Sequence, residues 1–398
     1  MSTIDFRSEA QAMRDELVAR RRDLHRHPEL AFEEVRTASI IAEELGQLGL
    51  EVQTGVGKTG VVGVLEGEHD GPTVLYRADM DALPILEENE VDYVSTTPGK
   101  MHACGHDGHV TIALGVAKLL AAHRDRLAGR VKFVFQPAEE TAGGAQAMIA
   151  DGVMHQPTPD VVLGMHLWNP VPLGTVGVAE GAIMSGASVF QIIVHGQGGH
   201  AALPSTAIDP VTCAAQLITA LHTMVGRKVD MMAGAVVLSV TSVETSSKAY
   251  NVIPEDVEIR GTFRTMNADT SRQLEDHIRA ISEAVCGSMG CTVDVNVNHQ
   301  TIPVVNDSRV TAQMRQLFAG MVGEANLDAQ VRTMAAEDVA YMLDAVPGMY
   351  VLVGASNAAR GLTYDHHHPR FDFDEDVLPL SVGLMSAAVA HYVMPDAQ

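Results

Sequence analysis

Short β-branched runs alternate with helical patterns along the first 170 residues, and this alternation constrains the fold more than any other feature of the chain. The runs lie at Val61–Leu65, Thr73–Tyr76, Val131–Phe135 and Val161–Leu167, and the helical patterns at Ala10–His25, Thr37–Leu48, His109–Leu120 and Ala145–Ala150. Such alternation is typical of α/β layers. We therefore predict an α/β fold in which a mixed, largely parallel sheet is flanked by helices.

The pattern changes near Ser185. Strand and helix patterns then follow at Val189–His195, Ile208–Val225, Ala235–Val243, Val257–Arg264, Ser271–Val285 and Thr292–Val297. This β-α-β-β-α-β order is ferredoxin-like. Because the helix and strand alternation resumes after His299, we predict one domain made of residues 1–184 and 299–398, with residues 185–298 inserted as an α+β domain.

Composition limits the binding partners and the cellular compartment that we expect for this chain. The chain carries 50 acidic and 27 basic residues, a net charge of −23, which disfavours binding to nucleic acids and anionic membranes. Its four cysteines show no disulfide framework, and the segment MSTIDFRSEA lacks the features of a secretory signal, so we expect a cytoplasmic protein. The apolar stretch Val377–Met394 contains Pro379 and Gly383, which favours a buried helix over a membrane span.

The densest chemical signal is the segment His102–His109 (HACGHDGH). It holds three histidines, the thiol of Cys104 and the carboxyl of Asp107 within eight residues, and two glycines allow tight turns. Thiolate and imidazole together suit a divalent cation such as zinc, cobalt or manganese. A reactive-thiol loop or a chance cluster is the alternative.

Other polar residues follow predicted strands. Glu139 and Glu140 come after Val131–Phe135, and two adjacent buried carboxylates are costly unless a cation neutralises them. One could bind a metal while the other takes a proton from water, although an ordinary solvated loop pair is the alternative. Ligand-type residues also end other strands or lie in loops, at Asp79, Asp81, His166 and Asp365–His368. Because carboxyl ends of strands converge in open α/β sheets, we predict a metal site there.

Three polar residues stand out in the inserted segment. His200 follows two glycines that favour an exposed loop, and its imidazole could donate to a developing oxyanion. Asn251 and Arg264 lie near predicted strand ends, and the guanidinium could bind a substrate carboxylate. A surface salt bridge is the alternative for Arg264.

Four motifs together identify a family resemblance. They are Arg77–Pro84 (RADMDALP), Met101–His109 (MHACGHDGH), Gln136–Glu140 (QPAEE) and Gly198–Pro204 (GGHAALP). With these motifs the chain resembles the aminoacylase and carboxypeptidase superfamily of di-metal peptidases. The match is to its amidohydrolase branch of hippurate hydrolases, N-acyl-L-amino-acid amidohydrolases and plant auxin-conjugate hydrolases. The resemblance runs from Leu24 to Asp372 and so covers nearly the whole chain.

The resemblance implies a role for each matching residue. Two divalent ions (Mn, Zn, Co or Ni) per subunit would be bound by Cys104, His106, Glu140, His166 and His367. Cys104 would take the bridging position, and Glu139 would be the general base and later the proton donor. The family pattern His-x-Pro favours His367, with His366 and His368 as alternatives.

The resemblance also gives the inserted domain a function. Residues 185–298 would be a lid that mediates assembly into a homodimer or tetramer. There His200 would stabilise the tetrahedral intermediate, and Asn251 and Arg264 would contact substrate. Asp81 would orient the site. One departure is Val339, where relatives usually carry phenylalanine after Glu-Asp.

These observations lead to a functional prediction. We expect a binuclear metal-dependent amidohydrolase that cleaves small N-acyl amino acids, such as N-acetyl or N-benzoyl derivatives, to a carboxylic acid and an amino acid. The enzyme alternatives are a metallo-dipeptidase or aminopeptidase and a deacetylase of an N-acetylated biosynthetic intermediate. A small-molecule binder without catalysis is a further alternative, and the intact Glu139 and ligand set argue against it.

Overall fold

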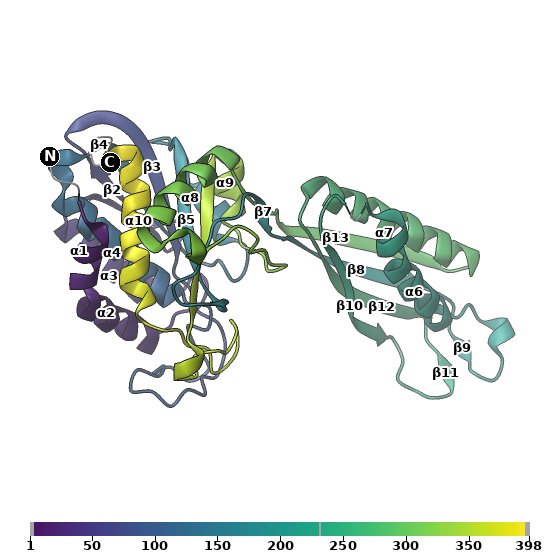
Figure 1. The fold of residues 1–398 in the computed structure, drawn as a ribbon. Helices are drawn as coiled ribbons and strands as arrows, with labels where there is room; N and C mark the ends of the chain where they lie inside the picture. Colours follow the sequence, from purple (N-terminus) through teal and green to yellow (C-terminus); the bar gives the residue numbers. More distant parts are fainter. Residues whose placement is uncertain (1–3, 231, 395–398) are drawn as a thin grey trace. The chain divides into compact units, whose positions relative to one another are not determined.

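The computed structural model describes residues 4–230 and 232–394, and the chain divides into two compact units (Figure 1). Unit 1 comprises Met1–Gly181, Val305–Arg332 and Asp338–Gln398. Unit 2 comprises Ala182–Val304 and Thr333–Glu337. The short strands β7 (Gly181–Met184) and β14 (Val304–Asn306) lie where the chain passes from one unit to the other.

Unit 1 is built on an eight-stranded mixed sheet in the order β1-β2-β4-β3-β5-β16-β6-β15. Its strands are β1 (Glu51–Val56), β2 (Gly60–Glu66), β3 (His69–Asp79), β4 (Ala128–Gln136), β5 (Val161–Pro172), β6 (Val176–Gly177), β15 (Leu327–Asp328) and β16 (Gly348–Ser356). The central strands β4, β3, β5 and β16 are parallel to one another, whereas β1, β2 and β6 introduce antiparallel pairs. The predicted mixed, largely parallel sheet is confirmed.

Helices surround this sheet. They are α1 (Phe6–Ala12), α2 (Arg14–Arg26), α3 (Val35–Gln47), α4 (His106–Ala122), α5 (Gly144–Ala150), α8 (Ser308–Val322), α9 (Ala340–Ala345) and α10 (Val377–Val393). The central strands are buried along most of their length, as expected for parallel strands covered on both faces.

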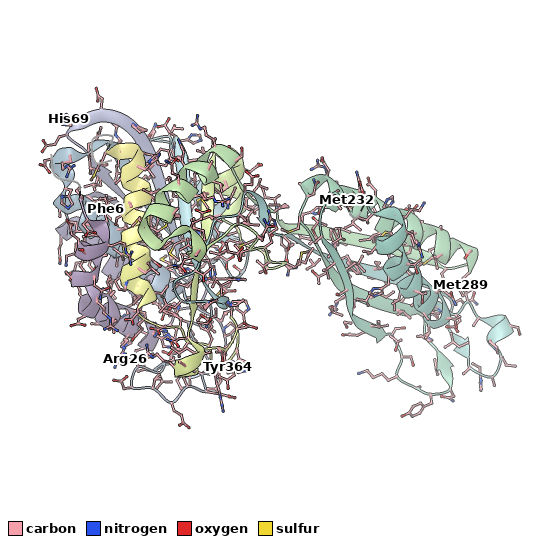
Figure 2. All side chains as sticks on the ribbon, in the orientation of Figure 1. Phe6, Arg26, His69, Met232, Met289 and Tyr364 are labelled. Atoms are coloured by element: carbon pink, nitrogen blue, oxygen red, sulfur yellow. The ribbon has the colours of Figure 1, made fainter. Side chains whose placement is uncertain are left out.

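The C-terminal helix α10 is almost wholly buried, as predicted from its composition. It packs against α1, α4 and β3, and its sequence has no acidic or basic residue apart from His391. The buried side chain of Phe6 on α1 belongs to the same core (Figure 2). No helix within the described part of the chain is both long and apolar enough to cross a membrane.

Unit 2 has its own sheet and core. Its main elements are β8 (Gly186–His195), α6 (Pro210–Lys228), β10 (Val236–Thr245), β12 (Asp256–Thr265), α7 (Ala268–Ser288) and β13 (Thr292–Thr301). The antiparallel sheet has the order β10-β12-β8-β13. Alternate residues of β8 and β12 are buried beneath α6 and α7, which leaves the other face of the sheet more exposed. A separate two-stranded ribbon joins β9 (Gly199–His200) to β11 (Val252–Ile253).

Candidate metal centre

The candidate site lies in unit 1, where the carboxyl ends of β3 and β4 meet β5. Asp79 ends β3 and pairs with Gln136 at the end of β4. The segments that follow these strands supply Asp81 and the Glu139–Glu140 pair, while His166 lies on β5 itself. The parallel arrangement therefore brings to one edge residues that are far apart in sequence, as the convergence argument predicts.

Five of the predicted residues form two groups of possible metal ligands. The first group is Cys104, His106 and His166, and the second is Cys104, Glu140 and His367. Within each group, the ligand atoms all lie within 4.8 Å of one another. The Sγ of Cys104 is 3.5 Å from Nε2 of His166, and Nε2 of His367 is 3.3 Å from Oε2 of Glu140. Cys104 belongs to both groups, so its thiol could contact two cations.

Two unpartnered atoms indicate that this arrangement suits a cation. Nε2 of His106 and Oε1 of Glu140 are buried and have no hydrogen-bond partner among the described residues, although they lie only 3.9 Å apart. Leaving such buried polar atoms unsatisfied is costly, and a cation bound at each of them would remove that cost. Thiolate, imidazole and carboxylate ligands together fit a borderline-soft divalent ion such as zinc or cobalt.

The electrostatics of the protein alone leave the thiol protonated. Burial, together with Glu140 and Glu139, raises the pKa of Cys104 well above its usual range. Burial lowers the pKa of His166, so its imidazole is neutral and can offer a lone pair. Burial opposes ionisation of Glu140, but the hydrogen bonds from His367 and Cys104 and the electrostatic attraction of His106 and His367 together outweigh it, and the pKa of Glu140 is lowered. Metal binding would have to displace the thiol proton, so cation affinity should rise with pH.

Asp81 connects several parts of the site. Its Oδ1 accepts from the backbone N–H of Glu139 and its Oδ2 from that of Glu140, each at 3.1 Å. Nδ1 of His106 lies 2.9 Å from the Asp81 carbonyl and 3.2 Å from its Oδ1. These acceptors place the proton of His106 on Nδ1 and leave Nε2 free to face the cluster. Asp81 is therefore positioned to orient both an imidazole and the paired carboxylates.

The structure distinguishes the three C-terminal histidines. His367 alone joins a ligand group, and it has a positive φ of 66°. Nε2 of His366 lies 2.9 Å from the carbonyl of Leu167, and its ring stacks on Trp168. His368 stacks on Tyr364 and accepts a hydrogen bond from a backbone N–H. Of the three, only His367 contributes an atom to a group of possible metal ligands.

Glu139 lies beside the ligands. Its carboxylate forms a group with His106 and Glu140, again with ligand atoms within 4.8 Å of one another. Adjacent carboxylates in one cluster can divide the work, with one binding a cation and the other exchanging protons. The preceding residue, Ala138, has a positive φ of 53°, a conformation that L-residues rarely adopt. This left-handed conformation turns the chain sharply after β4, at the cost of local backbone strain.

The remaining predicted residues belong to unit 2. His200 and Asn251 lie together, because β9 pairs with β11 and the N–H of Ala201 donates to the Asn251 carbonyl. Both residues are exposed. Arg264 lies near the C-terminal end of β12. The N-terminal end of that strand, at Asp256, follows β11 in the chain and is about 25 Å away along the strand. The Arg264 side chain is half-buried, and its guanidinium makes no hydrogen bond or ion pair with the described residues, so it does not form the alternative salt bridge.

Sequence reasoning did not predict Asp338 or the buried contacts that hold Asp79 behind the ligands. Arg77 donates to Asp79 and Asp338, and Asp338 also accepts from Gln136. All four side chains are almost completely buried. The acidic pair Glu337–Asp338 is visible in the sequence, but no local pattern connects Asp338 to β3. Val339, where the resemblance breaks, is fully buried just before α9.

Comparisons with known proteins agree with this geometry. The model of peptidase family M20/M25/M40 matches residues 75–391. Thermostable carboxypeptidase 2 of Saccharolobus solfataricus is 36% identical over 98% of this chain and 97% of its own. N-acetylcysteine deacetylase of Bacillus subtilis is 36% identical over 93% of this chain and 95% of its own.

A solved structure extends the similarity to the fold. It is a Bacillus subtilis protein described as a dinuclear metal binding peptidase from the M20 family. It matches with a TM-score of 0.84 and 32% identity, over 96% of this chain and 98% of that one. Fold, ligand-type cluster and relatives agree, so the chain belongs to peptidase family M20/M25/M40 and is a metal-dependent hydrolase.

Proposed function

We propose that the chain is a dinuclear metal-dependent amidohydrolase that cleaves N-acyl amino acids to a carboxylic acid and a free amino acid. The observation that carries this proposal is the thiol shared by two ligand groups, with Glu139 beside them. A relative named N-acetylcysteine deacetylase acts, by its name, on an N-acyl amino acid. A dinuclear metal centre is described for a protein of 32% identity and the same fold.

The proposed ligands are His106 and His166 for one ion, Glu140 and His367 for the other, and Cys104 for both. When bound, the two cations would lower the pKa of an attacking water and polarise the acyl carbonyl. The residues of the chain divide the remaining work between proton transfer and orientation.

Glu139 is the proposed proton carrier. It accepts a proton from the attacking water and returns it to the nitrogen of the leaving amine, so the carboxylate is regenerated after each cycle. Asp81 fixes the backbone from which Glu139 projects. In unit 2, which we propose as the lid, His200 donates to the developing oxyanion and the unpaired guanidinium of Arg264 binds the substrate carboxylate.

The neighbouring glutamates provide a matched test of these roles. We expect Glu139→Gln to lower kcat about 100- to 10,000-fold while the bound metal stays at the wild-type amount. Glu140→Gln should instead lower metal affinity, because it removes a charged ligand. Turnover with N-acetyl and N-benzoyl amino acids, and metal content by mass spectrometry, measure both effects. Near-normal kcat for Glu139→Gln would contradict the proton-carrier role.

A peptidase is the second candidate, because a relative of 36% identity is named a carboxypeptidase. The same metal-loaded protein should therefore be offered dipeptides beside the acyl amino acids, with a chelated control. Chelator-sensitive release from the acyl amino acids supports the proposed function. Release from the dipeptides alone would transfer the assignment to a peptidase.

A further inference from the structure

The backbone N–H and C=O of one residue in the metal centre, Leu167, are both held by imidazoles. The backbone N–H of Leu167 donates to Nε2 of His109 at 2.9 Å. The carbonyl of Leu167 lies 2.6 Å from Nδ1 of His166 and 2.9 Å from Nε2 of His366. The three imidazoles come from α4, β5 and the segment before α10, so the backbone of one residue gathers side chains from distant parts of unit 1.

The imidazoles form the hydrogen bonds to Leu167 that a neighbouring strand would otherwise form. The pairing of β3 with β5 ends at Arg77 and Gly164, so Leu167 lies beyond the last β3 partner. On its other side, β5 remains paired with β16 as far as Trp168 and beyond. A buried peptide without a strand neighbour needs other hydrogen-bond partners, and here histidine side chains supply them.

His109 cannot itself be a metal ligand in this arrangement. Its Nδ1 lies 2.5 Å from Oδ1 of Asp79, and its Nε2 accepts from Leu167, so both ring nitrogens are used. A carboxylate only accepts, so the proton of His109 is on Nδ1. Asp79 is in turn fixed by Arg77 at 2.7 Å. The His109 ring is thus locked in one orientation and one tautomer.

The consequence reaches the proposed ligand His166. The carbonyl of Leu167 can only accept, so it holds the proton of His166 on Nδ1 and leaves the lone pair of Nε2 pointing towards Cys104. The two groups lie in adjacent peptide units joined at the Cα of Leu167, so a displacement of this residue would disturb both the acceptor for His166 and the bond to His109. We propose that His109 is a positioning residue, which holds the backbone of Leu167 in place and so supports the ligating tautomer and direction of His166. This inference rests on the proposed function, because it takes His166 as a ligand.

Two variants separate the two hydrogen bonds of His109. His109→Gln places an amide oxygen near the position of Nε2, where it can still accept from Leu167. His109→Asn places its amide near Nδ1, where it can reach Asp79 but not Leu167. The variants therefore serve as controls for each other, since both remove a buried imidazole.

Cobalt(II) titration by calorimetry and absorption spectroscopy gives a readout independent of turnover. We expect His109→Asn to weaken one of two cobalt sites about 10- to 100-fold and to change its spectrum, while His109→Gln stays near wild type. Equal losses of cobalt affinity in both variants, or a loss in neither, would overturn this inference without contradicting the proposed function. Wild-type protein that binds no cobalt would overturn the proposed function as well.

A measurement on wild-type protein needs no substitution and so does not depend on a variant that folds. Histidine ¹⁵N NMR of the metal-free chain should show His109 and His166 each carrying a single proton on Nδ1. The amide proton of Leu167 should couple to Nε2 of His109 across the hydrogen bond. A proton on Nε2 of His109 would overturn the inference.

Discussion

At the scale of single residues, backbone conformation decides which histidine reaches the cluster. The positive φ of His367 reverses the direction of the chain between two histidines whose side chains point elsewhere. The N–H of His367 donates to the carbonyl of Ala103 at 2.7 Å, which ties this turn to the residue before Cys104. One backbone bond therefore places two proposed ligands side by side.

This placement predicts that His367 and its neighbour His368 differ in their contribution to metal binding. We expect His367→Ala to lower the bound metal from about two ions per chain to about one after dialysis, because a ligand to one ion is lost. His368→Ala is the matched control and should retain the wild-type metal content. Elemental analysis by mass spectrometry measures both. Equal metal content in the two variants would show that the choice between these histidines is wrong.

The types of residue at the site were predictable from the sequence, but the directions in which their side chains point were not. The run Asp365–His368 indicated a ligand, and only the family pattern favoured one position over the others. The choice depends on a left-handed residue and a contact with Ala103, neither of which a local pattern encodes. His109 shows the same limit, because its motif suggested a ligand while its two nitrogens are used by Asp79 and Leu167.

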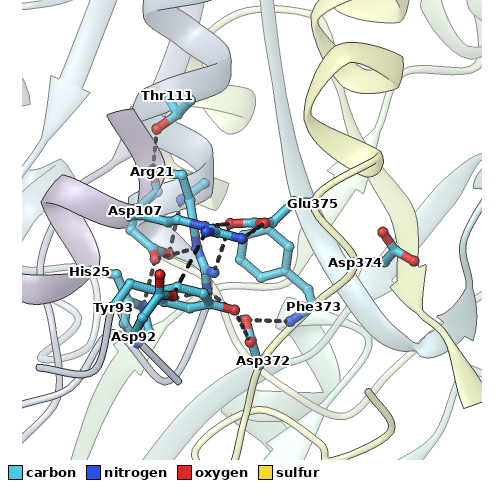
Figure 3. A network of polar contacts seen from close by, with 12 residues as sticks. Arg21, His25, Asp92, Tyr93, Asp107, Thr111, Asp372, Phe373, Asp374 and Glu375 are labelled. Atoms are coloured by element: carbon cyan, nitrogen blue, oxygen red, sulfur yellow. Dashed lines mark hydrogen bonds and ion pairs between the residues drawn. The ribbon is translucent and has the colours of Figure 1, made fainter. Parts of the chain in front are cut away.

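At the scale of elements, a buried ionic network connects α2 to the start of α4 and to the segment before α10 (Figure 3). Arg21 on α2 is completely buried and contacts Asp107 of α4 at 2.9 Å and Asp372 at 2.8 Å. Glu375, just before α10, lies 3.5 Å from the same guanidinium. Removing one partner of such a network leaves buried charge uncompensated, so these contacts fix how α2, α4 and the C-terminal segment pack.

His25, one turn along α2 from Arg21, makes this network sensitive to pH. Nδ1 of His25 lies 2.7 Å from Asp107, and Nε2 lies 3.1 Å from Glu87. Both carboxylates only accept, so both ring nitrogens carry protons. Burial and Arg21 oppose this charge, but the hydrogen bonds to Asp107 and Glu87 and the negative charge of Asp107 together outweigh them and raise the pKa of His25 above its ordinary 6.5.

The sign of the resulting pH dependence follows from linkage. Because the folded pKa is raised, the stability contributed by His25 is fully present below about pH 6.5 and is lost as the pH rises through the folded pKa. We expect the free energy of unfolding of wild type to exceed that of His25→Gln most at low pH. Denaturant titrations of both proteins at equal metal content, from pH 6 to 9, measure the difference. A difference independent of pH would mean that His25 is neutral.

Helical periodicity predicted α2, but not the burial of its charged residues. Arg21 and His25 lie on the same helix face as Leu17 and Leu24, but the local sequence shows no partner for their polar groups. They are buried because Asp107, Glu87 and Asp372 arrive from segments 60 to 350 residues away. The central strands and α10 were predictable because apolar composition alone determines their burial. The edge strand β1 was not predicted, since most of its residues are exposed.

At the scale of the whole molecule, each unit has a hydrophobic core of its own. The core of unit 2 is formed by residues such as Leu217, Ile259 and Leu274, drawn from α6, β12 and α7. Helix caps complete the unit, since Asp209 and Asn267 accept from backbone N–H groups at the starts of α6 and α7. A core, a complete sheet and capped helices are the requirements for independent folding.

We therefore expect residues 182–304, expressed alone, to unfold in one cooperative transition. Leu274→Ala should lower the fragment's free energy of unfolding by about 2–5 kcal/mol, because it empties a fully buried position. Val243→Ala is the control, because that side chain is 49% exposed, and it should change stability by no more than about 0.5 kcal/mol. Circular dichroism during urea titration measures all three proteins. A fragment without a cooperative transition would show that the core of unit 2 requires unit 1, and equal effects of the two substitutions would show that α7 is not packed in the isolated fragment.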